Sequence, residues 1–164
     1  MANTVRNPST NERTLIEAIN AIRHIEAASS VHADAAELVV TAANATDLAS
    51  AIALAQNLSD VYNTHRVDLL AHAAADSTNT VATAKTAIVS QSTAITFANE
   101  LKAAYNAHRS QSGVHHADDS GHATSSSDAS GALSLYTLLN ELKTDINAHM
   151  AASLAGASLR AIGF

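Results

Sequence analysis

The sequence has no cysteine and few aromatic residues, and these absences narrow what the chain can be. Without thiols there is no disulfide and no sulfur-ligated metal site. Aromatic residues make up only 3% of the chain, so a core must be built from Ala, Leu, Ile and Val, which pack closely between helices. One proline among 164 residues leaves long stretches free of the strongest helix breaker. The composition therefore favours a single helical domain.

Basic clusters and long apolar runs are missing as well. The nine Lys and Arg residues are scattered singly, with no aromatic residues spaced to stack on bases, so we expect no binding to nucleic acid. No run approaches the roughly 18 apolar residues of a membrane span, so we expect a chain made in the cytoplasm with no membrane partner. The formal charge is −6, and protonation of all nine histidines would make it positive.

What the sequence does contain is an internal repeat. The motif YNAHR at residues 105–109 matches YNTHR at 62–66 and INAHM at 146–150, and a weaker copy, INAIR, lies at 19–23. A leucine precedes each copy by four residues. Such self-similarity indicates duplication of one unit, here of about 42 residues.

Each copy has the apolar spacing of a helix. In the second copy, apolar and histidine positions recur at steps of three and four residues, which predicts one buried face. This seam comprises Leu48, Ala51, Ala55, Leu58, Tyr62, His65, Leu69 and His72. We expect one domain, 1–164, with repeat helices at approximately 9–28, 46–74, 89–117 and 131–153.

Polar segments rich in Asn, Thr, Ser, Asp and Gly connect the predicted helices. They are long enough either to reverse the chain or to cross back and place successive helices parallel. Residues 37–41, ELVVT, could be extended. The predicted fold class is all-α, a four-helix bundle or array in which each repeat is one long helix and a polar, partly extended linker.

Three histidines occupy the same position of the repeat, one turn after a Tyr or Ile. These are His65, His108 and His149, which follow Tyr62, Tyr105 and Ile146. Their register points them toward neighbouring helices. The simplest interpretation is structural, because a polar residue on a core seam fixes register and partner choice.

The alternative interpretation is a metal site. His65, His72 and Asp76 are spaced i, i+7, i+11. The next copy repeats this spacing at His108, His115 and Asp119. Imidazole and carboxylate ligands suit Zn, Ni or Cu. In a continuous helix, however, positions i and i+7 are about 10.5 Å apart along the axis, so one ion would need ligands from adjacent helices or subunits.

A denser group of metal-ligand residues follows the third copy. It comprises His115, His116, Asp118, Asp119 and His122. The spacing of His115, Asp119 and His122 would bring them together only if the helix continued, and Gly113 and Gly121 argue against that. A solvated polar loop is the simpler interpretation, so we expect no cofactor, with a metal ion as the alternative.

Four asparagines share one position of the repeat: Asn20, Asn63, Asn106 and Asn147. They are the only polar side chains kept in all four copies. Beside the seam and near the helix ends, they are expected to bond to connector backbone. The arginines Arg23, Arg66 and Arg109 are most simply solvated or paired with connector aspartates.

Catalytic motifs are absent. There is no GxSxG elbow, no HExxH, no Glu-x-x-His pair and no phosphate-binding glycine loop. We therefore expect no enzyme and assign no catalytic residue.

The phrase NELKxxYNAHR…VHHADDS, together with ANATDLASAIALA, resembles repetitive virion structural proteins of tailed bacteriophages. The resemblance implies a non-enzymatic particle component located in the virion, and it transfers no binding residue. We expect a capsid decoration or cement protein that acts through multivalent packing. Its partners would be other copies of itself, as a homo-oligomer, and other virion proteins. A tail or head–tail adaptor protein is one alternative, and a His/Asp metal-binding helical module is another.

Overall fold

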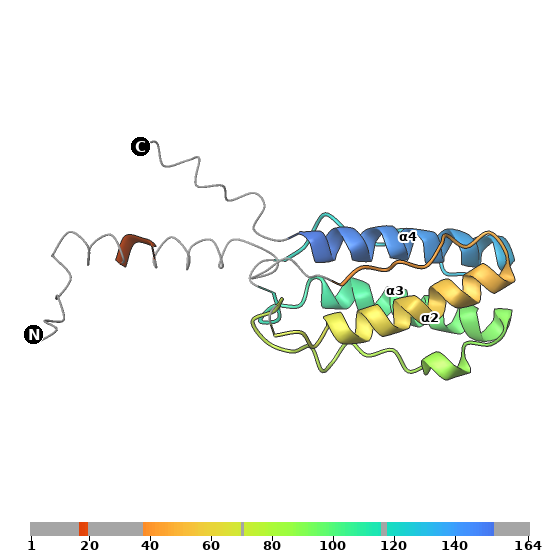
Figure 1. Cartoon of the computed structure of the whole chain (residues 1–164), viewed down its shortest axis with the longest axis horizontal. Coiled ribbons are helices and arrows are strands. Elements are labelled where there is room, and N and C mark those ends of the chain that lie inside the picture. The colour runs from red at the N-terminus through yellow and green to blue at the C-terminus, as the bar shows by residue number, and fades with distance from the viewer. Residues whose placement is uncertain (1–16, 20–37, 70, 116–117, 153–164) are drawn as a thin grey trace, which may run out of the picture.

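The protein was analysed as a computed structural model, which describes residues 17–19, 38–69, 71–115 and 118–152. The predicted all-α class is confirmed. The helices are α2 (Leu48–His65), α3 (Gln91–His108) and α4 (Ala132–Ala151), with a short 3-10 helix, η1 (Lys85–Ala87), between the first two. Helices α2, α3 and α4 pack against one another (Figure 1). Of the first predicted helix, 9–28, residues 17–19 are helical and the rest lies outside the described residues.

Side-chain caps fix where the helices begin. The carboxylate of Asp47 accepts a hydrogen bond from Ser50 N at 2.7 Å, and Ser50 Oγ accepts one from Asp47 N at 3.0 Å. Ser90 and Thr93 make the same reciprocal pair at the start of α3. These bonds satisfy N–H groups that the first helical turn leaves without partners.

Helices α2 and α3 end earlier than predicted, at His65 and His108 instead of near 74 and 117. Beyond His65 the chain turns into a closed loop, in which Asp76 N donates to Arg66 O at 2.7 Å and Arg66 Nη1 donates to Asp76 O at 2.6 Å. The Asp76 carboxylate accepts from two following backbone N–H groups, a local bonding pattern that competes with helix continuation. The equivalent bonds recur after α3, where Asp119 N donates to Arg109 O at 3.0 Å and Arg109 Nη1 donates to Asp119 O.

The three helices run parallel. Their last turns carry His65, His108 and His149, and the ring centroids of these histidines lie 5.2 to 5.5 Å apart. The carboxyl ends therefore meet at one end of the bundle. The connectors, residues 66–90 and 109–131, cross back to the other end before the next helix begins (Figure 1).

Helix side chains bind the backbone of the extended connectors. Asn140 accepts from Ala45 N at 2.7 Å and donates to Ala45 O at 3.1 Å. Asn99 makes the same two bonds with Ala129, at 2.7 and 3.1 Å. Residues 38–41, where the sequence allowed an extended segment, form no strand. Because side-chain amides satisfy the connector backbone, these segments can pack without a sheet.

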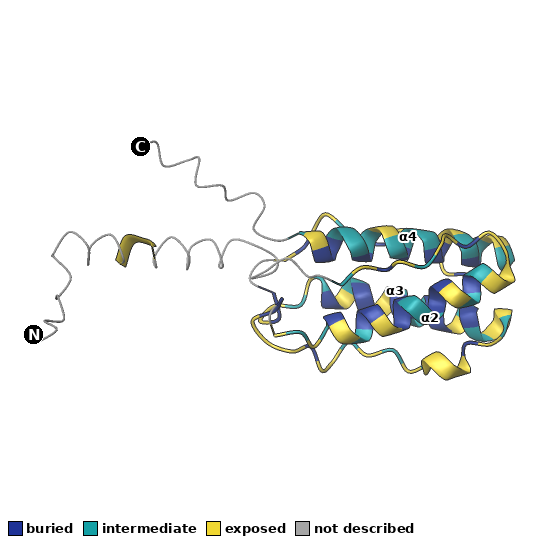
Figure 2. Cartoon of the chain, in the orientation of Figure 1, coloured by how far each residue is buried: buried dark blue, intermediate teal, exposed yellow. Residues whose placement is uncertain are grey.

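The core lies between the helices (Figure 2). Its largest fully buried side chains include Leu54, Leu58, Tyr62, Phe97, Leu101, Tyr105, Leu135, Leu138, Leu139, Leu142 and Ile146. The predicted seam is wrong at Leu48 and Leu69, which are 39% and 66% exposed. Leu48 is the first residue of its helix, and Leu69 lies beyond the helix end. None of the described helices combines the length and apolar character needed to cross a membrane.

Candidate metal centre

Five histidines meet at the carboxyl end of the bundle, and we call them the histidine cluster. Three lie in the last turns of helices and two come from the closed loops; they are His65, His72, His108, His115 and His149. Each can offer a ring nitrogen such that the five atoms all lie within 4.8 Å of one another. All five residues are buried, with exposures from 0% to 7%.

The early helix ends explain how His72 and His115 reach the cluster. On a continuous helix they would lie two turns from His65 and His108, but the closed loops fold them back onto the helix ends. Ala73 N donates to Val114 O at 2.8 Å, so the two loops are bonded together beside these histidines. The objection that i and i+7 positions cannot share an ion therefore does not apply.

Two aspartates orient the rings of the helical histidines. His108 Nδ1 lies 2.8 Å from Asp76 Oδ2, and His149 Nδ1 lies 2.7 Å from Asp119 Oδ2. In each pair the aspartate belongs to the loop before the helix that carries the histidine. A carboxylate on Nδ1 fixes that nitrogen as the N–H and leaves Nε2 as a lone-pair donor, the arrangement typical of metal-bound histidines.

The ring nitrogens of His72 and His108 fit this arrangement. His72 Nδ1 lies 3.0 Å from Asp68 O, a backbone acceptor that also selects the Nδ1–H form. The Nε2 atom of His108 is buried, and no group in the described part of the chain hydrogen-bonds to it. A buried nitrogen lone pair without a hydrogen bond is costly unless another ligand binds it.

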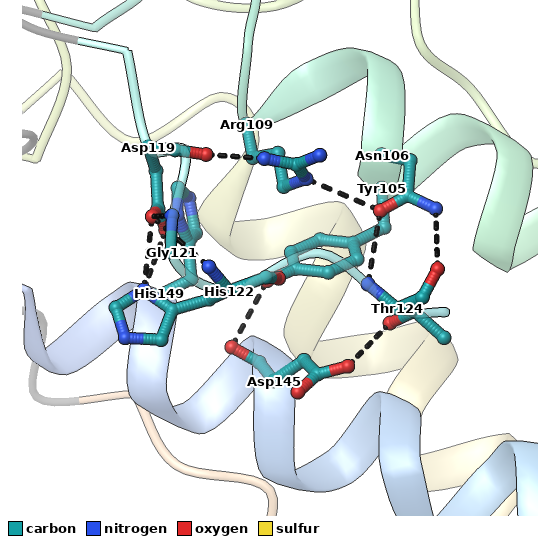
Figure 3. Close-up of polar contacts among 9 residues, drawn as sticks. All are labelled: Tyr105, Asn106, Arg109, Asp119, Gly121, His122, Thr124, Asp145 and His149. Carbon is teal, nitrogen blue, oxygen red and sulfur yellow. Dashed lines mark hydrogen bonds and ion pairs between the residues drawn. The ribbon is translucent and has the colours of Figure 1, made fainter. Parts of the chain in front are cut away.

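Both aspartates are ionised. Burial raises the pKa of Asp76, but hydrogen bonds from Asn79, from His108 and from Thr78 N outweigh it and lower the pKa to about 2. Asp119 is similar: burial opposes ionisation, and bonds from His149, His122 and Gly121 N bring its pKa far below the usual range (Figure 3). The cluster therefore has two negative charges beside it.

Burial favours the neutral form of three of these histidines. Burial lowers the pKa of His108 to about 4, although the hydrogen bond to Asp76 acts in the opposite direction. Burial also lowers the pKa values of His72 and His149. Neutral imidazole is the form that binds metal ions.

The helix dipoles add a further negative potential. Each helix carries a partial negative charge, roughly half an elementary charge, at its carboxyl end. Because α2, α3 and α4 are parallel, three such ends point at the histidine cluster. Two carboxylates and three helix ends around uncharged imidazoles make a site suited to a cation.

The other described residues that the sequence offered as metal ligands are not among the five donors. His122 is outside the cluster; its Nδ1 lies 2.8 Å from Asp119 Oδ2, and its side chain is 36% exposed. Asp76 and Asp119 orient histidines and are not among the five donors. His116 lies outside the described residues.

The tyrosines bind the closed loops to the helices. Tyr62 OH donates to Asn79 O at 2.7 Å, and the Tyr105 hydroxyl lies 2.6 Å from His122 O (Figure 3). Asn79 and His122 follow the two orienting aspartates by three residues. The tyrosines thus fix the loops that position Asp76 and Asp119.

The repeated asparagines divide into two groups. Asn106 bonds both N and O of Thr124, and Asn147 does the same with Val40. Asn63 accepts from Arg66 Nε at 3.1 Å, as Asn106 does from Arg109 Nε, but its amide nitrogen donates to Ser59 O of its own helix. Asn20 lies outside the described residues.

The arginines differ from the sequence-based expectation. Arg66 and Arg109 bond to the main-chain oxygens of Asp76 and Asp119 and not to their carboxylates. Each also donates through Nε to the asparagine three residues earlier. These bonds close the loops that carry His72 and His115. Arg23 lies outside the described residues.

The sequence placed His65, His108 and His149 on the core seam, and the alternative metal interpretation grouped His65 with His72 and His108 with His115 but left out His149. The equal spacing of seven residues in two copies was the correct signal, but on a continuous helix it separates the two histidines by about 10.5 Å, and the loops that bring them together were not predicted. Comparisons with protein-family models, curated proteins and solved structures find no match for this chain.

Proposed function

We propose that this chain is a metal-binding helical module in which one transition-metal ion joins the three parallel helices and their connectors. The observation that carries the proposal is the set of five buried histidines whose donor atoms lie within 4.8 Å of one another. Five imidazoles exclude a preference for Mg or Ca, which take oxygen ligands, and suit first-row ions such as Fe, Ni, Cu or Zn.

The charges around the cluster support a divalent ion. Imidazoles bind a metal ion in their neutral form and contribute no charge, whereas Asp76 and Asp119 contribute one negative charge each. A divalent cation would therefore be balanced by the carboxylates that orient two of its ligands. Such balance matters because an isolated charge is strongly disfavoured in a buried site.

The site suits a structural ion. With the histidines at most 7% exposed, a substrate would have no access to the ion without opening the bundle end. Ligands from three helices and two loops would be tied together, so binding would stabilise the fold directly. An enzymatic role is not proposed.

Metal content and melting temperature test this function. The full chain should be produced without a polyhistidine tag and analysed by inductively coupled plasma mass spectrometry. We expect one transition-metal ion per chain and a large fall in melting temperature after removal by a chelator. His108→Ala should lose the ion, whereas His122→Ala, the described histidine outside the cluster, should keep it. A chain that binds no transition metal after reconstitution would contradict the proposal.

A second candidate function is a structural component of a bacteriophage particle, with capsid decoration favoured over a tail or head–tail adaptor role. The repeat phrase supports it, as do exposed apolar side chains at Val39, Val89 and Leu133, which are 53%, 69% and 82% exposed. A structural ion is compatible with this role. Native mass spectrometry tests it: a defined homo-oligomer is expected, and a monomer at all concentrations would contradict it.

A further inference from the structure

The arrangement of the five rings identifies a coordination geometry. Eight of the ten ring pairs have centroids 4.5 to 5.5 Å apart, with the planes inclined by 65° to 90°. Four of these eight pairs contain the ring of His108, one with each of the other four histidines. It therefore neighbours every other member of the cluster.

The other four rings form a closed circuit. His65 neighbours His72 at 4.5 Å, and His72 neighbours His115 at 4.8 Å. His115 neighbours His149 at 5.1 Å, and His149 neighbours His65 at 5.2 Å. The two pairs left over, His65 with His115 and His72 with His149, are the diagonals of this square.

We propose that one ion binds all five imidazoles in octahedral coordination, with His108 on the axis and His65, His72, His115 and His149 around it. This inference rests on the proposed metal-binding function. A square pyramid has eight pairs of ligands at right angles and two opposite pairs, which is the pattern of the rings. A trigonal bipyramid has only six pairs at right angles, and a tetrahedron has room for only four ligands.

The donor separations agree with this geometry. At a metal–nitrogen bond of about 2.1 Å, opposite ligands of one ion are about 4.2 Å apart, whereas tetrahedral ligands are nowhere more than about 3.4 Å apart. The five donor atoms of the cluster lie within 4.8 Å of one another, which is closer to the 4.2 Å separation of opposite ligands than to the tetrahedral separation. Shifts of a few tenths of an ångström would bring all five nitrogens to one ion.

A square pyramid is an octahedron with one position left for another donor, here opposite His108. The site should therefore select ions that accept octahedral nitrogen coordination, namely Ni(II), Co(II) or Fe(II). Zinc is usually four-coordinate and tetrahedral in structural sites, so it should fit less well. In an equimolar mixture of Ni(II) and Zn(II), the metal-free protein is expected to take up mainly Ni(II).

Cobalt substitution tests the geometry. Octahedral Co(II) absorbs visible light weakly, and tetrahedral Co(II) absorbs it strongly. We expect the tag-free full chain to bind one Co(II) with weak visible absorption. Strong absorption would overturn the octahedral inference while leaving metal binding intact. No uptake of Co(II), Ni(II) or Zn(II) would instead overturn the proposed function itself.

Single substitutions test the number of ligands. His72→Ala and His115→Ala are the most informative, because these residues lie in loops and their loss leaves the helices capped and packed. Each should lower Ni(II) affinity at least about tenfold, since even partners outside the ligand shell have effects of that size. Thr137→Ala, an exposed change on α4, is the control and should leave affinity unchanged. If His72→Ala or His115→Ala leaves Ni(II) affinity unchanged in a chain of wild-type helix content, five-histidine coordination is wrong.

Discussion

Asp76 and Asp119 determine which ring nitrogen of His108 and His149 is available to a metal ion. Each accepts the Nδ1 hydrogen of a histidine and is itself held by backbone N–H groups of its own loop. The same residue therefore ends a local turn, orients a ligand and supplies charge. Loss of one such group should affect metal binding more than the loss of a surface carboxylate.

Asp76→Asn is predicted to lower metal affinity by about 10- to 100-fold, because His108 loses its charged acceptor. Asp128→Asn is the matched control: it removes an exposed carboxylate that pairs with Lys102 at 2.9 Å, and it should leave affinity unchanged. Titration of both metal-free variants with Ni(II) compares them. Equal affinities for the two variants would mean that Asp76 has no role in the site.

At the scale of elements, side-chain amides replace the strand pairing that the connectors lack. Asn99 and Asn140 each make both a donor and an acceptor bond to one connector residue. These residues, Ala45 and Ala129, are 3% and 5% exposed. Water therefore cannot readily replace the amide, and the connector depends on it.

Asn140→Ala is predicted to lower the free energy of unfolding by about 1 to 3 kcal/mol, since it leaves buried backbone groups of Ala45 without their bonds. Asn99→Ala should lower the free energy of unfolding by a similar amount, because Ala129 loses the equivalent two bonds. Thr137→Ala, an exposed change on the same helix as Asn140, should be close to neutral. Urea unfolding in the presence of metal compares all three. Equal midpoints for Asn140→Ala and Thr137→Ala would show that the amide contacts do not support the connector.

The helical class and most of the buried helix positions were predictable from the sequence, whereas two helix ends and the parallel order were not, for physical reasons. Helical periodicity gave the class and most of the buried face, because burial repeats with the helix turn. The ends of α2 and α3 were missed because His65 and Leu69 continue the same period across the closed loop. Parallel order could not be read from connector length, which allows either direction. It depends on amide contacts such as Asn140 with Ala45, which are distant in sequence.

At the scale of the whole molecule, the buried neutral histidines make stability depend on pH. The pKa of His108 is about 4 in the fold, against 6.5 when exposed, and burial lowers the pKa values of His72 and His149 as well. Between these values the unfolded chain binds protons that the folded chain does not. Stability should therefore be highest above pH 6.5 and fall as the pH decreases toward 4.

Urea unfolding of the metal-free protein should show this fall, on the order of 3 kcal/mol for His108 alone over the full interval. Because the pKa of Asp76 is about 2, its carboxylate stays ionised in the fold above pH 4, and its contribution to stability is lost only at lower pH. Above pH 4 the pH dependence of stability therefore comes mainly from the histidines. Without metal, His108→Gln should depend less on pH than the wild type. A pH-independent midpoint between 7.5 and 4.5 would contradict the prediction.

The histidine cluster joins chain positions from His65 to His149 in a protein that contains no cysteine. An ion bound there would close loops of the chain in the way that disulfides do, and the loss of unfolded-state entropy grows with the length of each loop. Unlike a disulfide, such a cross-link needs no oxidant to form and contains no sulfur–sulfur bond for a reductant to cleave. Its strength would instead follow the supply of metal, so the same chain could be loosely or tightly folded in compartments that differ only in their free metal concentration.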